Sequence, residues 1–472
     1  MTGPRPPLAS DVPYTATGRI FWTMDRVSKA LEACITLPAP AGAREFVAVS
    51  TDTRSITPGT LFVALQGDRF DAHDFLADAV RAGASALVVS SAERAVGVGV
   101  PVYVVRDTRV AYGALAHFRR EAWARPVIAI GGSNGKTSTK ALLSAMLGGV
   151  YDVHATAGNL NNEIGVPLTL LALPDDADVA VIEAGTNSPG EIARLRAIID
   201  PDVTVITSIG EEHLEGFGDV AGVLAEELAL TERVPVVVTP AAHPEVADGV
   251  TGDGQQVVIA GLDSGHMQPL RWRLETDGTG VLTFDDGDLH IPLRGVHNLR
   301  NAMLAVTVCR GFGVSLEQMQ SGVRRMQQPA MRAAVEPIGE ALLVNDAYNA
   351  NPPSMRAALD LLEAVGHGRP LVAVLGSMRE LGIGADALHD DIARDAIRRP
   401  LTLIVGIGDF VAALQRVAPD DPRIITADDA PLAEAELLRR SPPTAAILLK
   451  GSRGVRLERL VAPITAWATA AT

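Results

Sequence analysis

The stretch Gly131-Gly132-Ser133-Asn134-Gly135-Lys136-Thr137-Ser138 decides how the middle of the chain folds. It follows an apolar run at 127–130 and opens a helical pattern that extends to about Leu147. A strand, a glycine-rich turn and a helix N-terminus form a phosphate cradle, because glycines let backbone N–H groups turn toward oxyanions and the helix end carries partial positive charge. We therefore predict a P-loop that binds ATP, in which Lys136 reaches the β- and γ-phosphates and Thr137 binds Mg²⁺. The loop residues expected to bind the nucleotide are Gly132, Ser133, Asn134, Gly135, Lys136, Thr137 and Ser138.

This P-loop is shorter than the usual one. The standard motif has a further glycine ahead of its Gly-Lys pair, at the position that Ile130 occupies here. The alternative interpretation is a glycine-rich strand-to-helix turn in which Lys136 is merely solvated.

Outward from this loop, short apolar runs rich in β-branched residues alternate with amphipathic helical patterns almost throughout the chain. Continuous apolar strands that alternate with helices predict parallel sheets covered on both faces, which makes the fold class α/β. The predicted strands include 127–130, 179–182, 203–207, 236–239, 341–344, 371–375, 401–405 and 445–449, and the predicted helices include 108–124, 354–365 and 386–398.

A length of 472 residues suggests roughly three domains. The first is expected to end after a pair of strands at 86–89 and 102–105, and the second at the Gln-Gln-Pro-Ala interruption at 327–330. The predicted domains are 14–107, 108–327 and 328–472. The Pro-rich segment 1–13 lacks the apolar core of a signal peptide and is expected to be a disordered leader.

Composition limits the partners and the compartment. A formal net charge of -15 argues against non-specific binding to nucleic acid, because the phosphates would be repelled. No apolar run approaches the length of a membrane span. The two cysteines, Cys34 and Cys309, lie far apart in sequence and fit a reducing compartment, so a cytoplasmic location is expected.

Polar side chains follow several of the predicted strands, at the edge where parallel sheets bind ligands. Glu183 could bind Mg²⁺ there or be a solvated or capping glutamate, and His213 could act in the site or be structural. The asparagines Asn159, Asn161 and Asn162 could contact a polar ligand or simply form turns. Four further polar clusters, each taken by itself, are typical of a loop or a helix cap: Gly295–Asn301 around His297, Met331-Arg332, 346–355 and Lys450-Gly451-Ser452-Arg453.

In this order, the clusters resemble those of the Mur ligases, ATP-dependent amide ligases that build the peptidoglycan stem peptide, and most closely the MurF type. The resemblance extends from about residue 46 to 460. Its further motifs are Ser50-Thr51-Asp52-Thr53-Arg54, Gly59-Thr60-Leu61-Phe62-Val63-Ala64-Leu65-Gln66-Gly67, Asp71-Ala72-His73-Asp74-Phe75, Gly158-Asn159-Leu160-Asn161-Asn162 and Asp346-Ala347-Tyr348-Asn349-Ala350-Asn351-Pro352.

The resemblance implies an N-terminal UDP-sugar-binding domain, a central ATP-binding P-loop domain and a C-terminal Rossmann-like domain. It implies that ATP phosphorylates the terminal carboxylate of UDP-N-acetylmuramoyl-tripeptide, and that the amine of D-alanyl-D-alanine then attacks the acyl phosphate. Lys136, His213 and Arg332 would take part in catalysis, Arg332 near the γ-phosphate. The other implied contacts are His297, Asn298 and Asn301 with the adenine, Asp346 with the ribose, and Asp52, Arg54, Asn159, Asn161, Asn162, Tyr348, Asn349 and Asn351 with the substrates.

The implied Mg²⁺ ligands are Thr137, Glu183, His213 and Glu227. The last one departs from the family pattern, because the resemblance places a carbamylated lysine at this register. We hypothesise that Glu227 supplies that negative charge natively. Further departures are Gly131 in place of a common threonine, Ser188 in place of histidine, Ala347 in place of serine and Ser377 in place of aspartate.

Two other interpretations stay open at this point. One is a related ATP-dependent amide ligase of another pathway, such as a folylpolyglutamate synthetase-like enzyme. The other is a catalytically idle nucleotide-binding protein that regulates or scaffolds cell-wall synthesis. The resemblance also implies small-molecule substrates only and a monomer.

Overall fold

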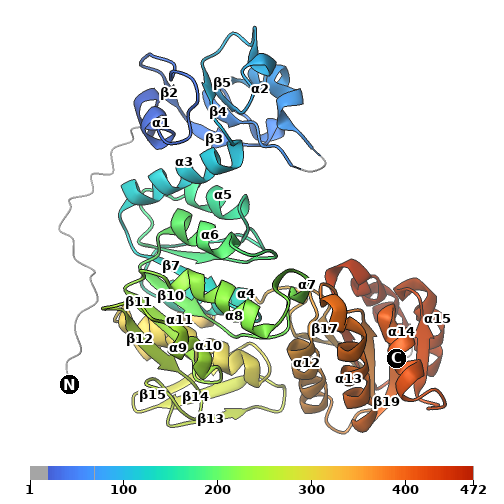
Figure 1. The fold of residues 1–472 in the computed structure, drawn as a ribbon. Coiled ribbons are helices and arrows are strands. Elements are labelled where there is room, and N and C mark those ends of the chain that lie inside the picture. Colours follow the sequence, from blue (N-terminus) through green and yellow to red (C-terminus); the bar gives the residue numbers. More distant parts are fainter. Residues whose placement is uncertain (1–19, 68–69, 471–472) are drawn as a thin grey trace. The chain divides into compact units, whose positions relative to one another are not determined.

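The computed structural model describes residues 20–67 and 70–470, so the predicted leader at 1–13 and the first predicted domain residues, 14–19, lie outside the described residues. The chain forms two compact units, whose elements are labelled in Figure 1. The first unit comprises residues up to Ala129 together with Asp152–Ala184 and Ala193–Asp202. The second comprises Ile130–Tyr151, Gly185–Ile192 and Val203–Thr472.

A four-stranded parallel sheet organises the N-terminal part of the first unit, in the order β3-β4-β5-β6. Because successive strand residues point to opposite faces, β4 is buried on both: Leu61 and Val63 join one apolar core, and Phe62 joins another. The strands are β3 (Ala48–Ser50), β4 (Thr60–Val63), β5 (Ala84–Val89) and β6 (Val102–Val104). Around them lie β1 (Trp22–Thr23), α1 (Met24–Ala30), β2 (Glu45–Phe46), η1 (Thr53–Ser55), η2 (Ala72–Phe75), α2 (Leu76–Ala82) and η3 (Glu93–Ala95).

Helix α3 (Thr108–Trp123) confirms the helix predicted at 108–124. The Asp107 side chain caps its start by accepting from the backbone N–H of Arg109 at 2.7 Å, and the helix ends where Ala124 adopts φ 53°. The unit also contains β8 (Val153–Ala155), α5 (Gly165–Leu171), β9 (Val179–Glu183) and part of α6 (Glu191–Ile199).

Six strands form the central sheet, in the order β12-β11-β10-β7-β9-β8, and the boundary between the units passes through β7. The pairs β8–β9, β10–β11 and β11–β12 are parallel. The strands predicted at 127–130, 179–182, 203–207 and 236–239 are confirmed as β7 (Val127–Gly131), β9, β10 (Val203–Ile206) and β11 (Val236–Pro240), with β12 (Gln256–Ala260) beside them. The helices are α4 (Lys136–Leu147), α7 (Leu214–Phe217), α8 (Val220–Leu228), η4 (Ala229–Thr231), α9 (Pro244–Gly249), α10 (Val296–Gly311) and α11 (Leu316–Val323).

A three-stranded antiparallel sheet, which the sequence analysis did not predict, lies between β12 and α10 along the chain. Its strands are β13 (Arg271–Leu274), β14 (Gly280–Phe284) and β15 (Gly287–Ile291).

The C-terminal sheet has the order β16-β17-β21-β18-β19-β20 and is parallel except for the β16–β17 pair. Helices α12 to α14 contribute to the apolar core on one face, and α15 and α16 to the core on the other, which confirms a sheet covered on both faces. The strands are β16 (Ala334–Ile338), β17 (Ala341–Asp346), β18 (Leu371–Gly376), β19 (Leu401–Ile407), β20 (Ile424–Ala427) and β21 (Ala446–Lys450). The helices are α12 (Pro352–Val365), η5 (Gly382–Gly384), α13 (Ala385–Arg398), α14 (Asp409–Val417), α15 (Ala430–Arg440), η6 (Arg453–Val455), η7 (Leu457–Leu460) and α16 (Val461–Ala470).

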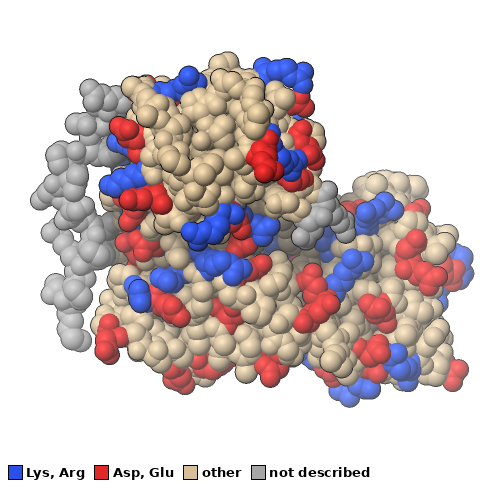
Figure 2. All heavy atoms as spheres, turned by 45° about the horizontal axis from the view of Figure 1, so that its top comes forward, with Lys and Arg blue, Asp and Glu red and all other residues tan. Residues whose placement is uncertain are grey.

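Acidic and basic side chains are interspersed on the face shown in Figure 2, and many lie beside a partner of opposite sign. Ion pairs of this kind join Arg310 to Asp286 and Arg423 to Asp421. Among the described residues, none of the helices has both the length and the apolar character needed to cross a bilayer.

Candidate active site

The P-loop connects β7 to α4, and two of its glycines adopt conformations that other residues rarely reach. Gly132 has φ 111° and Gly135 has φ 90°. A Cβ at Gly132 would lie 2.4 Å from Thr207 Oγ1, and one at Gly135 would lie 2.5 Å from Asn301 Oδ1. Both positions therefore require glycine, for backbone conformation and for space.

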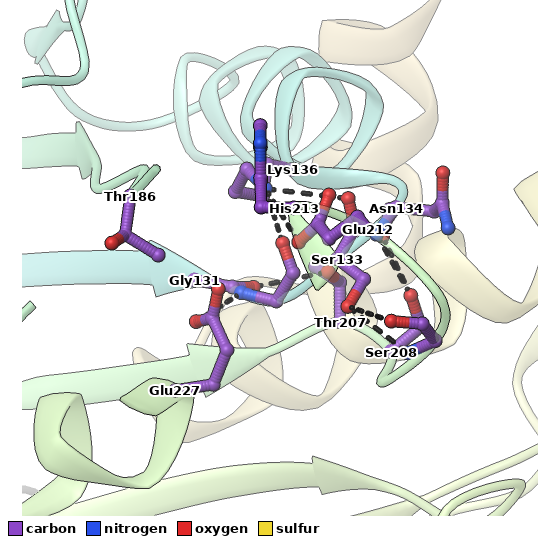
Figure 3. A network of polar contacts seen from close by, with 12 residues as sticks. Gly131, Ser133, Asn134, Lys136, Thr186, Thr207, Ser208, Glu212, His213 and Glu227 are labelled. Atoms are coloured by element: carbon purple, nitrogen blue, oxygen red, sulfur yellow. Dashed lines mark hydrogen bonds and ion pairs between the residues drawn. The ribbon is translucent and has the colours of Figure 1, made fainter. Parts of the chain in front are cut away.

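The segment after β10 holds the P-loop in place, as Figure 3 shows. The backbone N–H of Ser133 donates to the Ser208 carbonyl at 2.8 Å, and that of Asn134 donates to Ser208 Oγ at 2.9 Å. Thr207 donates from its backbone N–H to the Gly131 carbonyl at 3.0 Å. These bonds fix the loop as one rigid turn.

Lys136 begins α4 and folds back over the loop. Its Nζ donates to the Gly132 carbonyl, lies 3.3 Å from the Ser133 carbonyl oxygen and is 3.7 Å from Glu212 Oε1. Figure 3 shows Glu212 and His213 grouped beside this amine. Phosphate oxygens in the loop would offer Lys136 the same kind of acceptors.

Glu212 is a site residue that the sequence analysis missed, because only its position beside His213 hinted at it. Its side chain is buried, and this burial raises the pKa of Glu212 to about 8. The charge of Lys136 acts in the opposite direction, and the neighbouring Glu227 carboxylate adds to the increase in pKa.

Glu227, a predicted metal ligand, lies on α8 and points at the P-loop. Its Oε2 accepts from the backbone N–H of Gly132 at 2.7 Å, and its Oε1 is buried without a hydrogen-bond partner. Burial raises the pKa of Glu227, while Lys136 and the bond from Gly132 oppose that shift. A second oxygen directed into the site without a partner is suited to a cation.

The adjacent Glu226 points elsewhere, which makes Glu227 the member of the pair that belongs to the site. Glu226 accepts from the backbone N–H groups of Gly190 at 2.7 Å and Ile192 at 2.8 Å, and from Thr186 Oγ1 at 3.3 Å. It satisfies N–H groups around the beginning of α6, which is a structural role.

His213 directly precedes α7 and has φ 48°, an uncommon conformation for a residue other than glycine. Its Nδ1 contacts the carboxylate of Glu380, a residue of the loop after β18 that the sequence analysis did not single out. Burial lowers the pKa of His213, and the charge of Glu380 opposes that shift.

The predicted adenine contacts form a chain of side chains at the start of α10. Asn298 Nδ2 donates to the Arg294 carbonyl at 2.8 Å and lies 3.1 Å from His297 Nε2. Asn301 Nδ2 donates to Asn298 Oδ1 at 3.1 Å, and the Asn301 amide abuts Gly135. The structure therefore connects this cluster to the P-loop. Burial lowers the pKa of His297.

Predicted site residues of the C-terminal sheet lie around the end of β17. Asp346 Oδ2 is paired with Lys450 Nζ at 2.7 Å, and the Arg332 guanidinium lies over the Tyr348 ring, 4.2 Å from its centroid. Asn349 is exposed.

Asn351 makes a direct contact with the P-loop. Its Nδ2 donates to Asn134 Oδ1 at 2.9 Å, while its Oδ1 accepts from the backbone N–H of Ser354 at 3.0 Å and caps α12. Asn351 therefore both caps α12 and forms a hydrogen bond with the side chain of Asn134 in the P-loop.

The first unit brings together two more predicted residues. Glu183, at the end of β9, is buried, and its Oε1 accepts from Asn161 Nδ2 at 3.0 Å. Asn162 Oδ1 accepts from the backbone N–H of Gly165, the first residue of α5, at 2.9 Å, whereas Asn159 is exposed.

Asp52 and Arg54 form a separate pair after β3. Arg54 Nη2 lies 2.6 Å from Asp52 Oδ2, and the hydrogen bonds from Arg54 hold the pKa of Asp52 at about 2. The Arg54 side chain is 88% exposed, so its guanidinium is accessible to a ligand.

Comparisons with known proteins match the chain in three successive segments. The models are "Mur ligase family, catalytic domain" at residues 45–120, "Mur ligase middle domain" at 130–309 and "Mur ligase, glutamate ligase domain" at 324–453.

Relatives match over nearly the whole length. The UDP-N-acetylmuramoyl-tripeptide–D-alanyl-D-alanine ligase of Escherichia coli (strain K12) is 34% identical over 433 residues, covering 88% of this chain and 92% of the relative. The enzyme of that name from Bacillus subtilis (strain 168) is 34% identical over 446 residues, with the same coverage. The crystal structure of MurF from Acinetobacter baumannii has a TM-score of 0.84 at 31% identity, covering 94% of this chain and 99% of that one. The fold is thus the three-domain α/β fold with parallel sheets, and the chain belongs to the Mur ligase family.

Proposed function

We propose that this protein is an ATP-dependent ligase that joins D-alanyl-D-alanine to UDP-N-acetylmuramoyl-tripeptide in peptidoglycan precursor synthesis. Two relatives that bear the name of this ligase are 34% identical over 88% of the chain. The structural observation that carries the proposal is the rigid P-loop, with Lys136 at its centre and Glu212, His213 and Glu227 beside it.

ATP binds with its phosphates in the P-loop in this proposal. The backbone N–H groups at the N-terminus of α4 and the side chain of Lys136 bind the phosphate oxygens, and the cluster of His297, Asn298 and Asn301 contacts the adenine. Asp346 contacts the ribose, and Arg332 approaches the γ-phosphate.

The reaction transfers the γ-phosphoryl group to the terminal carboxylate of the tripeptide. The amine of D-alanyl-D-alanine then attacks the acyl phosphate, the amide bond forms and phosphate leaves. Because the first step brings two anions together, Lys136 and the N–H groups at the N-terminus of α4 have to neutralise charge where it develops. The rigid hydrogen bonding of the loop keeps these groups oriented before the substrates arrive.

We also propose a magnesium site next to the phosphates, formed by Thr137, Glu183, His213 and Glu227. Among the described residues, no cluster of three or more His, Cys, Asp or Glu side chains is gathered to hold a metal ion. Glu183, His213 and Glu227 are therefore not gathered into one cluster in this structure, and the phosphates of ATP would complete the site, because Mg²⁺ is usually bound by one or two carboxylates together with substrate phosphates. The buried, unpartnered Oε1 of Glu227 fits such a site. Bound magnesium would supply positive charge against the phosphate oxygens.

The remaining assignments belong to the same proposal. Asp52, Arg54 and the asparagines Asn159, Asn161 and Asn162 bind the UDP-linked substrate, and Tyr348, Asn349 and Asn351 contribute further substrate contacts. The domains are 14–107, 108–327 and 328–472. The protein acts in the cytoplasm as a monomer.

Phosphate release tests the proposal. The purified protein is incubated with ATP and Mg²⁺, and UDP-N-acetylmuramoyl-tripeptide and D-alanyl-D-alanine are added separately and together. Release that requires both substrates and falls about 10²- to 10³-fold in Lys136→Ala would support the ligase. A parallel series contains other amino-acid or peptide substrates. Phosphate release in that series, without release from the named pair, would indicate an amide ligase of another pathway. ATP binding without release under any combination would indicate a nucleotide-binding protein without catalysis.

A further inference from the structure

We infer that Glu380 is a positioning residue, which fixes the ring orientation and tautomer of His213 so that Nε2 of His213 is the atom presented to a divalent cation. The inference rests on the proposed function, because it takes His213 as a metal ligand. It concerns a residue to which neither the sequence analysis nor the proposed site assigns a role.

The first step is the contact itself. Glu380 pairs with Nδ1 of His213, and because a carboxylate can only accept, the Nδ1–H group donates the hydrogen bond. A neutral imidazole has one N–H, so donation from Nδ1 leaves the lone pair of Nε2 available for a metal ion. Metal-binding histidines usually donate their other ring N–H to a carboxylate, carbonyl or water, which sets the tautomer and orients the ring.

The second step is the conformation of the two residues. His213 has φ 48° and Glu380 has φ 64°, so both adopt the left-handed backbone region, which is uncommon for residues other than glycine. Such conformations persist where the surrounding structure holds them, and they gather at functional sites. Here two residues with such conformations contact each other through their side chains.

The third step is the way the two segments are joined. The backbone N–H of Glu215 donates to the Glu380 carbonyl at 3.2 Å. Gly382 lies so close to the start of α7 that a Cβ there would be 3.2 Å from the Glu215 backbone. The Glu380 side chain therefore approaches His213 from a loop whose backbone is already docked on the same turn.

The loop is also fixed at its base. Met378 donates from its backbone N–H to His389 Nε2 at 2.9 Å, and Ser377 Oγ accepts from the backbone N–H of Asp409 at 2.9 Å. Arg379 donates from its backbone N–H to Ser452 Oγ at 3.0 Å. Glu380 is thus presented by a rigid support, as a positioning residue requires.

Two measurements on the full-length protein test the inference, and neither needs turnover. The first is the tautomer of His213, read from long-range ¹H–¹⁵N spectra of ¹⁵N-histidine-labelled protein and assigned by the signals lost in His213→Gln. We expect protonated Nδ1 and unprotonated Nε2 in the parent protein, and loss of that single tautomer in Glu380→Ala. Glu380→Gln keeps an acceptor oxygen and should largely retain it.

The second measurement is Mn²⁺ binding at one fixed pH, by electron paramagnetic resonance with a non-hydrolysable ATP analogue bound. Glu380→Ala should weaken Mn²⁺ binding about 10- to 100-fold, and Glu380→Gln should weaken it less. The matched control is Glu215→Gln, which removes an exposed carboxylate from the same turn and should leave Mn²⁺ binding within about twofold of the parent.

Unchanged Mn²⁺ affinity or an unchanged tautomer in Glu380→Ala would overturn the inference, as would unchanged affinity in His213→Gln. An equal loss in Glu215→Gln would also overturn it, because the effect would then be one of general charge. If both measurements agree with the expectation while the parent protein releases no phosphate with the two substrates, the proposed function fails and the positioning role stands.

Discussion

Gly131 and Glu227 occupy adjoining space at the end of β7: a Cβ at Gly131 would lie only 2.7 Å from Glu227 Oε2. The same carboxylate oxygen accepts from the backbone N–H of Gly132 at 2.7 Å, so it cannot move away without losing that bond. These two positions are both departures from the family pattern, a glycine for a threonine and a glutamate for a lysine. We expect the two positions to depend on each other, because the small residue leaves room for the buried carboxylate.

Gly131→Ala should therefore destabilise the protein, by about 1–3 kcal/mol, because the added methyl group overpacks the space beside Glu227 and Leu230. Urea unfolding of Gly131→Ala, Glu227→Ala and the double variant measures the dependence. In the Glu227→Ala background, Gly131→Ala should lower the free energy of unfolding by less than it does in the parent, with a difference of at least about 0.5 kcal/mol. Equal costs in both backgrounds would show that the two positions are independent.

Glu227→Gln should separate the role of the charge from that of the hydrogen bond. Glutamine keeps an oxygen for the Gly132 N–H but removes the negative charge, so we expect a lower rate and a larger Mg²⁺ requirement, each by about 10-fold or more. The melting temperature should not fall, because the variant no longer has to bury a carboxylate. Substrate-dependent phosphate release at a series of Mg²⁺ concentrations provides the measurement. A parent-like rate and Mg²⁺ requirement would remove Glu227 from the proposed site.

The strands that position the site were predictable because they are buried. In β7, β9 and β18 every residue is buried, so the sequence shows a continuous apolar run that ends at a polar loop. Strand β13, Arg271-Trp272-Arg273-Leu274, has alternating exposure instead. Such a short half-exposed strand carries little signal of its own, and its pairing with β14 depends on contacts that the local sequence does not specify.

The P-loop and the residues after strand ends were predictable for a similar reason, since local sequence determines turns and helix starts. The contacts between distant segments were not. Asn351 and Asn134 are 217 positions apart, and their hydrogen bond depends on how whole sheets pack. Glu212 and Glu380 are likewise recognisable as site residues only from their contacts with Lys136 and His213, and those contacts form only in the tertiary structure.

Protonation of Asp71 should lower the stability of the folded protein as the pH falls from 4 toward 2. Burial acts to raise the pKa of this carboxyl, but hydrogen bonds from His73 and Arg94 outweigh it and hold the pKa at about 2. Because the folded pKa lies below the ordinary value of about 4, the stabilisation is present above pH 4 and is lost as the pH falls toward 2. Melting temperatures measured between pH 4 and pH 2 should therefore fall less steeply in Asp71→Asn than in the parent.

The matched control for this prediction is Asp74→Asn. Asp74 also pairs with Arg94, but its side chain is 67% exposed, so water screens the interaction. Its acid profile should follow that of the parent. If Asp71→Asn and the parent lost stability with the same slope, the contacts of Asp71 with His73 and Arg94 would not be the source of the acid sensitivity.

Asn351 allows helix capping to be separated from P-loop contact. Asn351→Ala removes both the cap of α12 and the bond to Asn134, so it should cost about 1 kcal/mol in stability and also weaken ATP binding. Asn351→Asp retains a cap, because a carboxylate accepts from the Ser354 N–H and is favoured at a helix N-terminus. It has no N–H to donate to Asn134 Oδ1. The aspartate variant should therefore unfold at nearly the parent urea concentration and yet show a raised Kd for ATP, measured by calorimetry. Parent-like ATP affinity in Asn351→Asp would mean that the bond between Asn351 and Asn134 does not hold the P-loop for the nucleotide, and that Asn351 acts only as the N-cap of α12.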